Sequence, residues 1–586
     1  MKKIIAFILA VVMVFALVSC SDSGSNANNK GSSSANNNKG SSSSEVVAEG
    51  DDAVTNLLAD GTLAATFGEG ANGKEVAEYV DQVVYAMSGT SFDIGPFGKS
   101  SGGREFVAQR IYAGLMYMPY YGAPLEECQY NLAKSVTKTD DLTYEVELYD
   151  YIHDSKGNAI TSEDVVFSYE MCRKVQNPST IGAYLDEIIV HDDYNMTFKL
   201  KSSGAGVIES VLANYKMCIV DKDWYENSSD DEHIYDIATT NAYYISKYDP
   251  GSILEFLPVE DYWQTDPNLV CDINKQTVGH IIYKSVKEDA MRAITLENNE
   301  CDAASIEKSD ISHFFDAATG EAGDGYSVHL RSSTGYYKVQ LNMSDNSVLK
   351  DNYNLRMAIL CALNGEEIGA AIGLESYEFQ TCTGFGTNIM AGWSDELDYG
   401  DEYYPKSKAQ EYFEASGYKA GELTLVMMAK TSLIDAFVTM AQAQLQAIGI
   451  NVEILSVDSS LANTYMYDST KWDLWLNNDR AEGYVTDAWN TNFHPDNYSE
   501  GVYNASFCED TGDLVSLIEA ATQTLAVEDL VAVSDTLYEM AMYKPIFVKY
   551  EYFASQDGIL EFAFDAGMNP VPNLFKYSVD YVSDVK

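Results

Sequence analysis

The sequence predicts an α/β protein, because segments with a helical pattern alternate along the chain with segments patterned as strands. Residues 434–448 place apolar side chains on one helical face, Gly449 follows, and residues 450–454 (INVEI) return as a strand. Residues 142–148 (LTYEVEL) alternate apolar and polar side chains, as a half-buried strand does. Helices that return through glycine to strands are typical of layered α/β folds.

Further elements follow from local signals. Residues 81–87 (DQVVYAM) predict a first strand. Helices are expected to begin at 161–164 (TSED), 285–288 (SVKE) and 407–410 (SKAQ). In each of these, Ser or Thr precedes an acidic or amide residue by three positions, which is the pattern of a capping box. The last of these helices should end near Gly417.

Length and charge limit the class of protein. The 586 residues leave room for two to four domains at roughly 100–200 residues each. Hydrophobic residues make up 46% of the chain, which is enough for sizeable cores. The formal net charge is −52, and such an acidic surface repels nucleic acid and anionic lipid headgroups. We therefore exclude nucleic acid as a partner and expect no membrane binding through charge.

The N-terminus has the pattern of an export signal. Lys2 and Lys3 precede an apolar run at 4–18, which spans about 22 Å as a helix and is too short for a bilayer core of about 30 Å. The sequence Leu-Val-Ser-Cys that ends at Cys20 resembles a bacterial lipobox, a signal after which the cysteine carries a diacylglycerol. Residues 21–44 are almost all Ser, Asn, Gly and Lys, and predict a flexible tether. A soluble body held outside a cell membrane is therefore expected.

Metal and cofactor sites are not predicted. Apart from Cys20, the cysteines are widely spread and form no CxxC pair, so the pattern argues against zinc or iron–sulfur sites. Disulfides and isolated buried thiols both remain open. The histidines form no HExxH motif, and the folded body contains no GxSxG motif, so no cofactor, metal or catalytic residue is assigned.

Several segments, in this order, resemble the extracellular solute-binding proteins that serve oligopeptide and dipeptide ABC transporters, known as family 5. The likeness runs from about residue 80 to residue 582 and rests on stretches that match the family's patterns. These are 111–115 (IYAGL), 154–169 (DSKGNAITSEDVVFSY), 241–263, 355–364 (LRMAILCALN) and 405–418. Each is moderately specific alone, and their common order makes the resemblance strong.

The same stretches have structural explanations. Gly157 should occupy a turn with positive φ, and the 250–251 pair (PG) should form a hairpin turn. Arg356 lies between apolar helix positions and is expected to form a structural ion pair. None of these residues is therefore assigned to the ligand.

The resemblance implies a two-lobe, periplasmic-binding-protein type II-like α/β fold with an extra subdomain. The chain is expected to cross between lobes near 336–341 and 542–548, with hinge closure around a ligand. The implied segments are a signal peptide at 1–19, a lipidated cysteine and tether at 20–77, lobe I at 78–115, 236–334 and 547–586, the extra subdomain II at 116–235, and lobe III at 335–546.

The resemblance also implies where a ligand lies. In peptide-binding relatives an extended peptide pairs with strands between the lobes, and its amino terminus meets a carboxylate. The matching segment here is 472–480 (WDLWLNNDR), in which Asp479 falls about where relatives carry that carboxylate. Arg480 departs from the pattern; it is expected either to satisfy Asp479 or to meet a ligand carboxylate. The assigned ligand residues are Tyr336, Tyr337, Trp475, Leu476, Asn477, Asn478, Asp479, Arg480, Tyr484 and Trp489.

The expected function is non-enzymatic capture of an oligopeptide and its delivery to an ABC permease and its ATPase. We expect a monomer, lipid-anchored at the extracellular face of a bacterial membrane. An oligosaccharide is the alternative ligand, since the aromatic residues near 472–489 could stack on sugar rings. A sensor of the same fold and an extracellular hydrolase also remain, the hydrolase being the least favoured. The acidic stretch 395–402 lacks the spacing of an EF-hand and is interpreted as a solvated face.

Overall fold

The computed structural model of the protein describes residues 64–67 and 74–585 with short gaps. The gaps fall at 93, 98–103, 121, 176–178, 333–334, 383, 388–389, 398, 400–401, 432, 434, 480–482, 496–497, 499–500 and 566–568. The predicted signal peptide, Cys20 and most of the predicted tether lie outside the described residues. Residues 64–67, which the resemblance assigns to the tether, form a strand, β1 (Ala64–Phe67), that pairs with β15.

Most strands belong to one sheet of 13 strands, in which the order β19-β18-β20-β16-β21-β12-β2-β11-β10-β9 forms the main path. Besides β1, its strands are β2 (Val83–Met87), β9 (Tyr243–Asp249), β10 (Ile253–Pro258), β11 (Ile281–Ser285), β12 (Ala303–Ile306), β15 (Tyr326–Ser332), β16 (Tyr336–Leu341), β17 (Phe379–Thr381), β18 (Thr424–Lys430), β19 (Asn451–Val457), β20 (Leu474–Asp479) and β21 (Tyr543–Gln556).

The remaining strands form smaller sheets. A four-stranded sheet has the order β5-β6-β8-β7, and the others are strand pairs. Their bounds are β3 (Met116–Tyr117), β4 (Gln129–Tyr130), β5 (Ala133–Asp140), β6 (Thr143–Leu148), β7 (Leu185–Val190), β8 (Asn195–Leu200), β13 (Phe315–Asp316), β14 (Glu321–Ala322), β22 (Ile559–Glu561) and β23 (Lys576–Tyr577).

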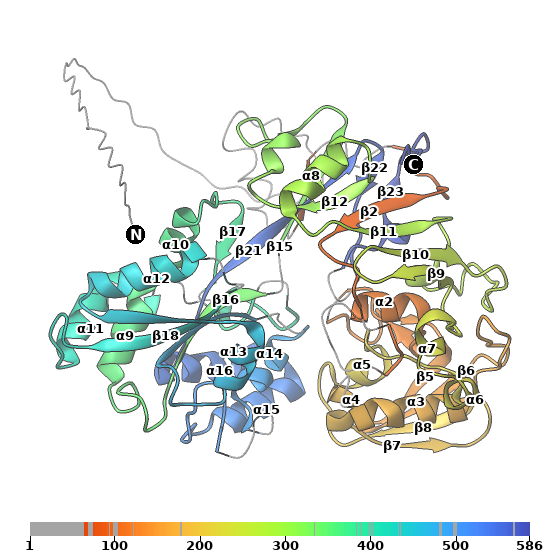
Figure 1. Cartoon of the computed structure of the whole chain (residues 1–586). Coiled ribbons are helices and arrows are strands. Elements are labelled where there is room, and N and C mark those ends of the chain that lie inside the picture. Colours follow the sequence, from red (N-terminus) through yellow and green to blue (C-terminus); the bar gives the residue numbers. More distant parts are fainter. Residues whose placement is uncertain are drawn as a thin grey trace, which may run out of the picture. The chain divides into compact units, whose positions relative to one another are not determined.

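Helices alternate with these strands, as Figure 1 shows. Several begin at an Asn or Asp cap: Asn352 Oδ1 accepts the Leu355 amide at 3.0 Å, and Asp458 Oδ1 accepts the Leu461 amide at 2.9 Å. The helices are α2 (Arg104–Ile111), α3 (Ser162–Val175), α4 (Ser179–Tyr184), α5 (Val207–Leu212), α6 (Lys222–Asn227), α7 (Glu232–Tyr235), α8 (Asp289–Glu297), α9 (Tyr353–Ala362), α10 (Gly365–Ala371), α11 (Ala409–Ala415), α12 (Asp435–Ala447), α13 (Ser459–Tyr465), α14 (Val485–Phe493), α15 (Leu514–Thr524) and α16 (Val527–Met540).

The long strand β21 belongs to both parts of the large sheet. Its first residues pair with β16 through the register Gln340↔Tyr543 to Tyr337↔Phe547, and its last residues pair with β15 and β12. The register with β16 shifts near Pro545, which lacks the N–H that a ladder needs. Figure 1 shows β21 as one continuous arrow.

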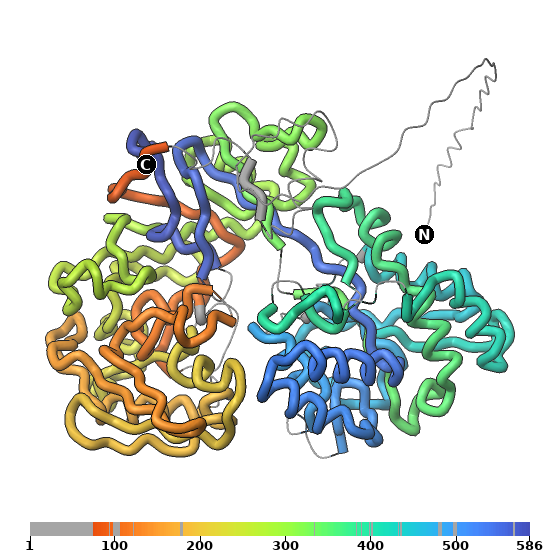
Figure 2. Tube along the Cα trace, turned by 180° about the vertical axis from the view of Figure 1, so that it is seen from behind, coloured from red at the N-terminus to blue at the C-terminus, as the bar shows by residue number. Residues whose placement is uncertain are grey.

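Two large apolar cores stabilise the described chain. The first packs α9, α12, α14 and α16 against β16, β18, β20 and β21. The second lies among α2, α3, α5 and the four-stranded sheet. Figure 2 shows the C-terminal segment in blue beside the N-terminal strands in red, and Ala77 N–H donates to the Tyr577 carbonyl at 2.8 Å. The two ends of the described chain are therefore hydrogen-bonded to each other in the folded protein.

The structure confirms the predicted α/β class and several local elements. The predicted strand at 81–87 is β2, and the predicted helix and strand around Gly449 are α12 and β19, with Gly449 at φ 100°. At α3 the capping pattern holds, because Thr161 N–H donates to Asp164 Oδ2 at 2.8 Å. Gly157 has φ 85° as expected.

The other two capping boxes are wrong. Ser285 is the last residue of β11, where it pairs with Met87, so α8 begins only at Asp289. Ser407 lies inside a 3-10 turn at Lys406–Lys408, and α11 begins after it without a side-chain cap. A strand pair takes up the first of these residues and a 3-10 turn takes up the second, so neither caps a helix.

Candidate ligand-binding site

The large sheet contains two sets of parallel strands, and the carboxyl ends of each set lie together. β18 pairs in parallel with β19 and β20, and β2 pairs in parallel with β11 and β12. In open α/β sheets, ligands bind outside the carboxyl ends of parallel strands. For β18 and β20 those ends are Lys430 and Asp479, which is where the sequence analysis places the ligand.

At these carboxyl ends β20 extends beyond its parallel partner β18. β16 pairs with β20 as far as Tyr336↔Asp479, whereas the β18 ladder covers only Leu474–Leu476. Leu476 is therefore laddered on both sides. β18 ends at Lys430, one residue beyond the Ala429↔Leu476 pair, so Asn478 and Asp479 extend past the end of β18, and their outer backbone groups face a position that an added strand could occupy.

The side chains of β20 differ in exposure. Trp475 is 4% exposed and packs 6.0 Å from Trp472, while Leu476 lies in the apolar core. Asn477 is buried and Asn478 is exposed. For Asp479 the structure describes the backbone alone, and Arg480 lies outside the described residues, so both assignments stay predictions.

The predicted aromatic residues are largely enclosed. The Tyr543 hydroxyl donates to the Tyr336 hydroxyl at 2.7 Å, and both rings are buried. Tyr337 is half-buried and stacks on Phe547 with ring centroids 4.4 Å apart; burial raises its pKa to about 12. Trp489 donates its indole N–H to the Phe385 carbonyl at 2.7 Å. Their burial favours packing roles for Tyr336 and Trp489.

Tyr484 follows β20 and bridges to Ala391. Its ring lies against Gly206, where a Cβ would come 2.6 Å from a ring atom, and φ of Gly206 is 78°. A glycine is needed here, because the ring occupies the space of any side chain. Tyr484 is 6% exposed, and burial raises its pKa.

Sequence reasoning missed a buried polar group on the same strands. Lys338 is 1% exposed; its ammonium donates to Asn492 Oδ1 at 2.8 Å and lies 5.1 Å from the Tyr543 ring centroid. Gln340 is fully buried, and its Nε2 lies 3.5 Å from the same Asn492 oxygen. Desolvation lowers the pKa of Lys338 well below its usual value, and nearby Lys430 lowers it further. The polar positions of the β16 sequence YYKVQL were the available signal.

The sequence matches the model of one protein family over most of its length. The model described as "Bacterial extracellular solute-binding proteins, family 5 Middle" matches residues 127–506. The chain belongs to this family.

The curated relatives that the chain matches are distant from it in sequence. A protein of Agrobacterium fabrum named as a peptide-binding protein is 24% identical over 181 residues, 28% of this chain and 29% of that protein. A protein of Brucella ovis named as an ABC transporter peptide-binding protein is 20% identical over 402 residues, 64% of this chain and 70% of that protein.

Solved structures of family 5 type share the fold. The substrate-binding protein CtaP of Listeria monocytogenes matches with a TM-score of 0.67 and 17% identity, over 87% of this chain and all (100%) of that one. The oligopeptide-binding protein AppA of Bacillus subtilis, solved with a nonapeptide, matches with a TM-score of 0.65 and 14% identity, over 84% and 98%. These likenesses confirm the predicted two-lobe fold.

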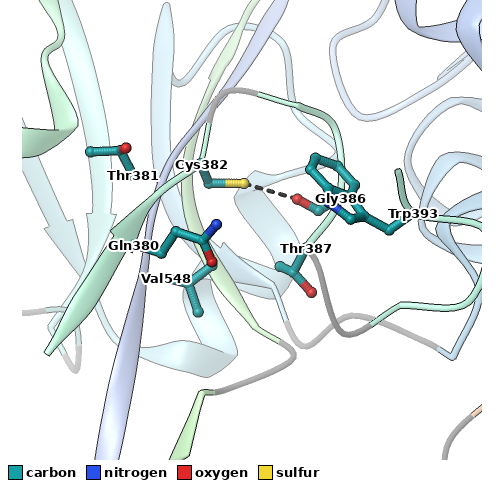
Figure 3. A pocket seen from close by; sticks show the side chains of 7 residues that line it. All are labelled: Gln380, Thr381, Cys382, Gly386, Thr387, Trp393 and Val548. Carbon is teal, nitrogen blue, oxygen red and sulfur yellow. Dashed lines mark hydrogen bonds between the residues drawn. The ribbon is translucent and has the colours of Figure 1, made fainter. Parts of the chain in front are cut away.

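A small cavity lies beside β17 and β21 (Figure 3). It is lined by Gln380, Thr381, Cys382, Gly386, Thr387, Trp393 and Val548, and its volume is about 10 Å³. Cys382 Sγ donates to the Gly386 carbonyl at 2.9 Å across one wall. A single water molecule needs about 10–15 Å³ of such space, so we do not place the family 5 ligand here.

Two further features are absent from the described part of the chain. Among those residues, no cluster of three or more His, Cys, Asp or Glu side chains is placed to hold a metal ion. No described helix combines the length and the apolar character that crossing a membrane requires.

Proposed function

We propose that this family 5 protein is the substrate-binding component of an ABC importer and captures an oligopeptide between its lobes. The observation that carries the proposal is the outer edge of β20 at residues 478–479, which extends past the end of β18 at the carboxyl end of parallel strands. An extended peptide that adds there would bond through its backbone, which every peptide possesses, whatever its side chains. Hinge closure of the lobes would then bury the ligand for delivery to a permease and its ATPase.

Asp479 is proposed to receive the peptide's amino terminus. It ends β20 opposite Tyr336, so its backbone lies at the unpaired edge. A charge-assisted hydrogen bond at that position would orient the peptide along the strand. The burial of Trp475 and Trp489 leaves these rings little surface for stacking on sugar, which favours a peptide over an oligosaccharide.

Mass spectrometry of ligand released by denaturing gently purified protein tests the ligand class. Peptides in the released fraction support the proposal, and oligosaccharides in their place would contradict it. Calorimetry with an identified peptide then tests Asp479→Ala, which should weaken binding by about 1.5–3 kcal/mol. The matched control is Asp580→Ala, an exposed carboxylate far along the chain, which should bind as the wild type does.

We further propose that the body is held outside the bacterial cell by a lipid on Cys20. The lipobox-like sequence before Cys20 and the polar segment that follows it support this anchor. Cys20→Ala should move the protein from the membrane fraction to the medium or periplasm and abolish incorporation of labelled palmitate. Retention of the variant in the membrane fraction would contradict the lipid anchor.

A further inference from the structure

Two glycines lie where elements of the two large apolar cores touch. Gly204 and Gly206 precede α5, whose buried apolar side chains belong to the second core. They face Gln523, near the end of α15, and Tyr484, just before α14. The buried apolar side chains of α14 and α15 belong to the first core. Parts of the molecule with different cores are therefore in contact at these glycines.

The approach at both glycines is too close for a side chain. A Cβ on Gly206 would lie 2.6 Å from a ring atom of Tyr484, and a Cβ on Gly204 would lie 2.8 Å from the Thr522 carbonyl oxygen. Non-bonded carbon atoms pack best at about 3.5–4.0 Å. Any larger residue at these positions would therefore have to hold the two parts further apart.

A third glycine repeats this arrangement. Gly122 lies between β3 and β4, in a segment whose buried residues mostly belong to the second core. A Cβ there would lie 2.8 Å from the Ala391 Cβ and 2.8 Å from the Gly483 carbonyl oxygen. The Ala391 N–H donates to that same carbonyl at 2.8 Å, so Ala391 is held beside Tyr484. Glycines from two separate loops thus face one region around Tyr484.

Close fit is the main feature of this contact. The Ser203 hydroxyl donates to Gln523 Oε1 at 3.2 Å, and this hydrogen bond is exposed to solvent, so it adds little to the contact. The Tyr484 ring is 6% exposed where it lies on Gly206, so it is covered largely by backbone. A contact that depends on shape can separate and form again when hinged parts move.

We propose that Gly122, Gly204 and Gly206 form the surface on which the lobe that carries β20 closes, and that the Tyr484 ring sets how far it closes. The inference rests on the hinge closure of the proposed function and specifies where that motion stops. Because glycine lacks a Cβ, this glycine surface permits the closest approach that a backbone allows. Contacts that exist only in the closed arrangement favour closing, and Tyr484 comes soon after the strand proposed to hold the peptide.

Chemical crosslinking tests this contact in the purified protein without a ligand. Ser203→Cys and Gln523→Cys together place two thiols where these side chains meet, and a short bismaleimide should join them. Adding Gly206→Ala should slow the crosslinking about tenfold, because the methyl group meets the ring. Adding Tyr484→Ala as well removes the ring and should restore most of the rate. Mass spectrometry of the joined tryptic peptides measures the rate.

Gly157→Ala is the matched control in the same doubly substituted protein. Gly157 has φ 85°, close to the 78° of Gly206, but no atom lies within 4 Å of its added Cβ. The control therefore carries the backbone strain without the clash, and it should crosslink at the unchanged rate.

Three results would overturn the inference. These are no crosslink between the two introduced thiols, an equal rate with Gly206→Ala, and a slow rate that Tyr484→Ala does not restore. The last result would mean that Gly206→Ala acts on α5 rather than on the contact with the ring. None of them bears on the ligand class, which the mass spectrometry of released ligand tests separately.

Discussion

The buried carboxylate of Glu378 pairs with the ammonium of Lys308 at 2.5 Å, although Lys308 follows β12 and Glu378 precedes β17. Glu378 is 1% exposed, and the Tyr552 hydroxyl donates to the same oxygen at 2.5 Å. The Lys549 ammonium adds a second pair nearby, at 3.3 Å from Glu307. These contacts join the segments that flank β21 in both parts of the sheet.

Lys308→Met should destabilise the protein, because it leaves a buried carboxylate without its cation. We expect a loss of about 1–3 kcal/mol in the free energy of unfolding, since the partly exposed Lys308 is screened by solvent. Urea denaturation followed by circular dichroism measures the change. Lys350→Met removes an ion pair with the exposed Asp345 and should leave the stability almost unchanged, because solvent screens this pair. Equal losses in the free energy of unfolding for the two variants would contradict the expected stabilisation by the Lys308–Glu378 pair.

Stability should fall on acidification because of His329. Burial lowers the pKa of this β15 histidine to about 3, so the folded protein keeps it neutral where the unfolded chain, near 6.5, takes up a proton. The resulting loss in the free energy of unfolding is absent above pH 6.5 and grows as the pH falls towards 3. It reaches about 2 kcal/mol at pH 5.

His329→Gln removes that proton uptake while other acid-sensitive groups stay. Thermal melts at pH 7.5 and pH 5 should therefore show a smaller loss of stability on acidification for the variant than for the wild type. Parallel losses in the two proteins would contradict a neutral buried imidazole.

Gly449→Ala should destabilise the end of α12. Gly449 has φ 100°, and a Cβ there would lie 2.8 Å from the Ala420 Cβ, so the substitution meets both backbone strain and a clash. We expect a loss of about 1–3 kcal/mol by chemical denaturation. Gly182→Ala lies within α4 and has no atom within 4 Å of the added Cβ, so it should be neutral or slightly stabilising. A neutral Gly449→Ala would show that the turn can rearrange.

Ellman's reagent should react with the folded protein only slowly. The structure describes eight free cysteines, all buried: Cys128, Cys172, Cys218, Cys271, Cys301, Cys361, Cys382 and Cys508. Burial raises the pKa of the Cys128, Cys271 and Cys301 thiols to about 12, which removes the reactive thiolate. After unfolding in guanidinium without reductant, all eight should react; a lower number would mean that disulfides form.

Local sequence patterns predicted the elements that local interactions determine. The helix α12, the turn at Gly449 and strand β19 follow one another within 23 residues of chain, from Asp435 to Val457, and each carries its own signal. The capping boxes at 285 and 407 failed where pairing with a distant strand or a tighter turn took precedence. Arg356 was expected in an ion pair, yet its Nη1 donates to the Leu349 and Lys350 carbonyls, both at 2.8 Å.

The family resemblance assigned the ligand to the segments that form β16 and β20, and this assignment stays a prediction. The structure adds that these two strands are paired, with Tyr336 opposite Asp479. The buried role of Lys338 was not predictable, because Asn492, whose Oδ1 accepts the hydrogen bond from the Lys338 ammonium, lies 154 residues further along the chain. A pattern with a period of two shows which face a side chain takes, but the helix that covers that face comes from elsewhere in the sequence.

The position of β21 in the chain affects the order of folding. This strand lies at the centre of the large sheet, between β16 and β12, yet it consists of residues 543–556 out of 586. Until the last tenth of the chain has left the ribosome, neither part of the sheet has its middle strand, and only contacts near in sequence can form. Synthesis from the N-terminus therefore yields an incomplete sheet, and a nascent chain truncated before Tyr543 should expose two unpaired strand edges to chaperones or to aggregation.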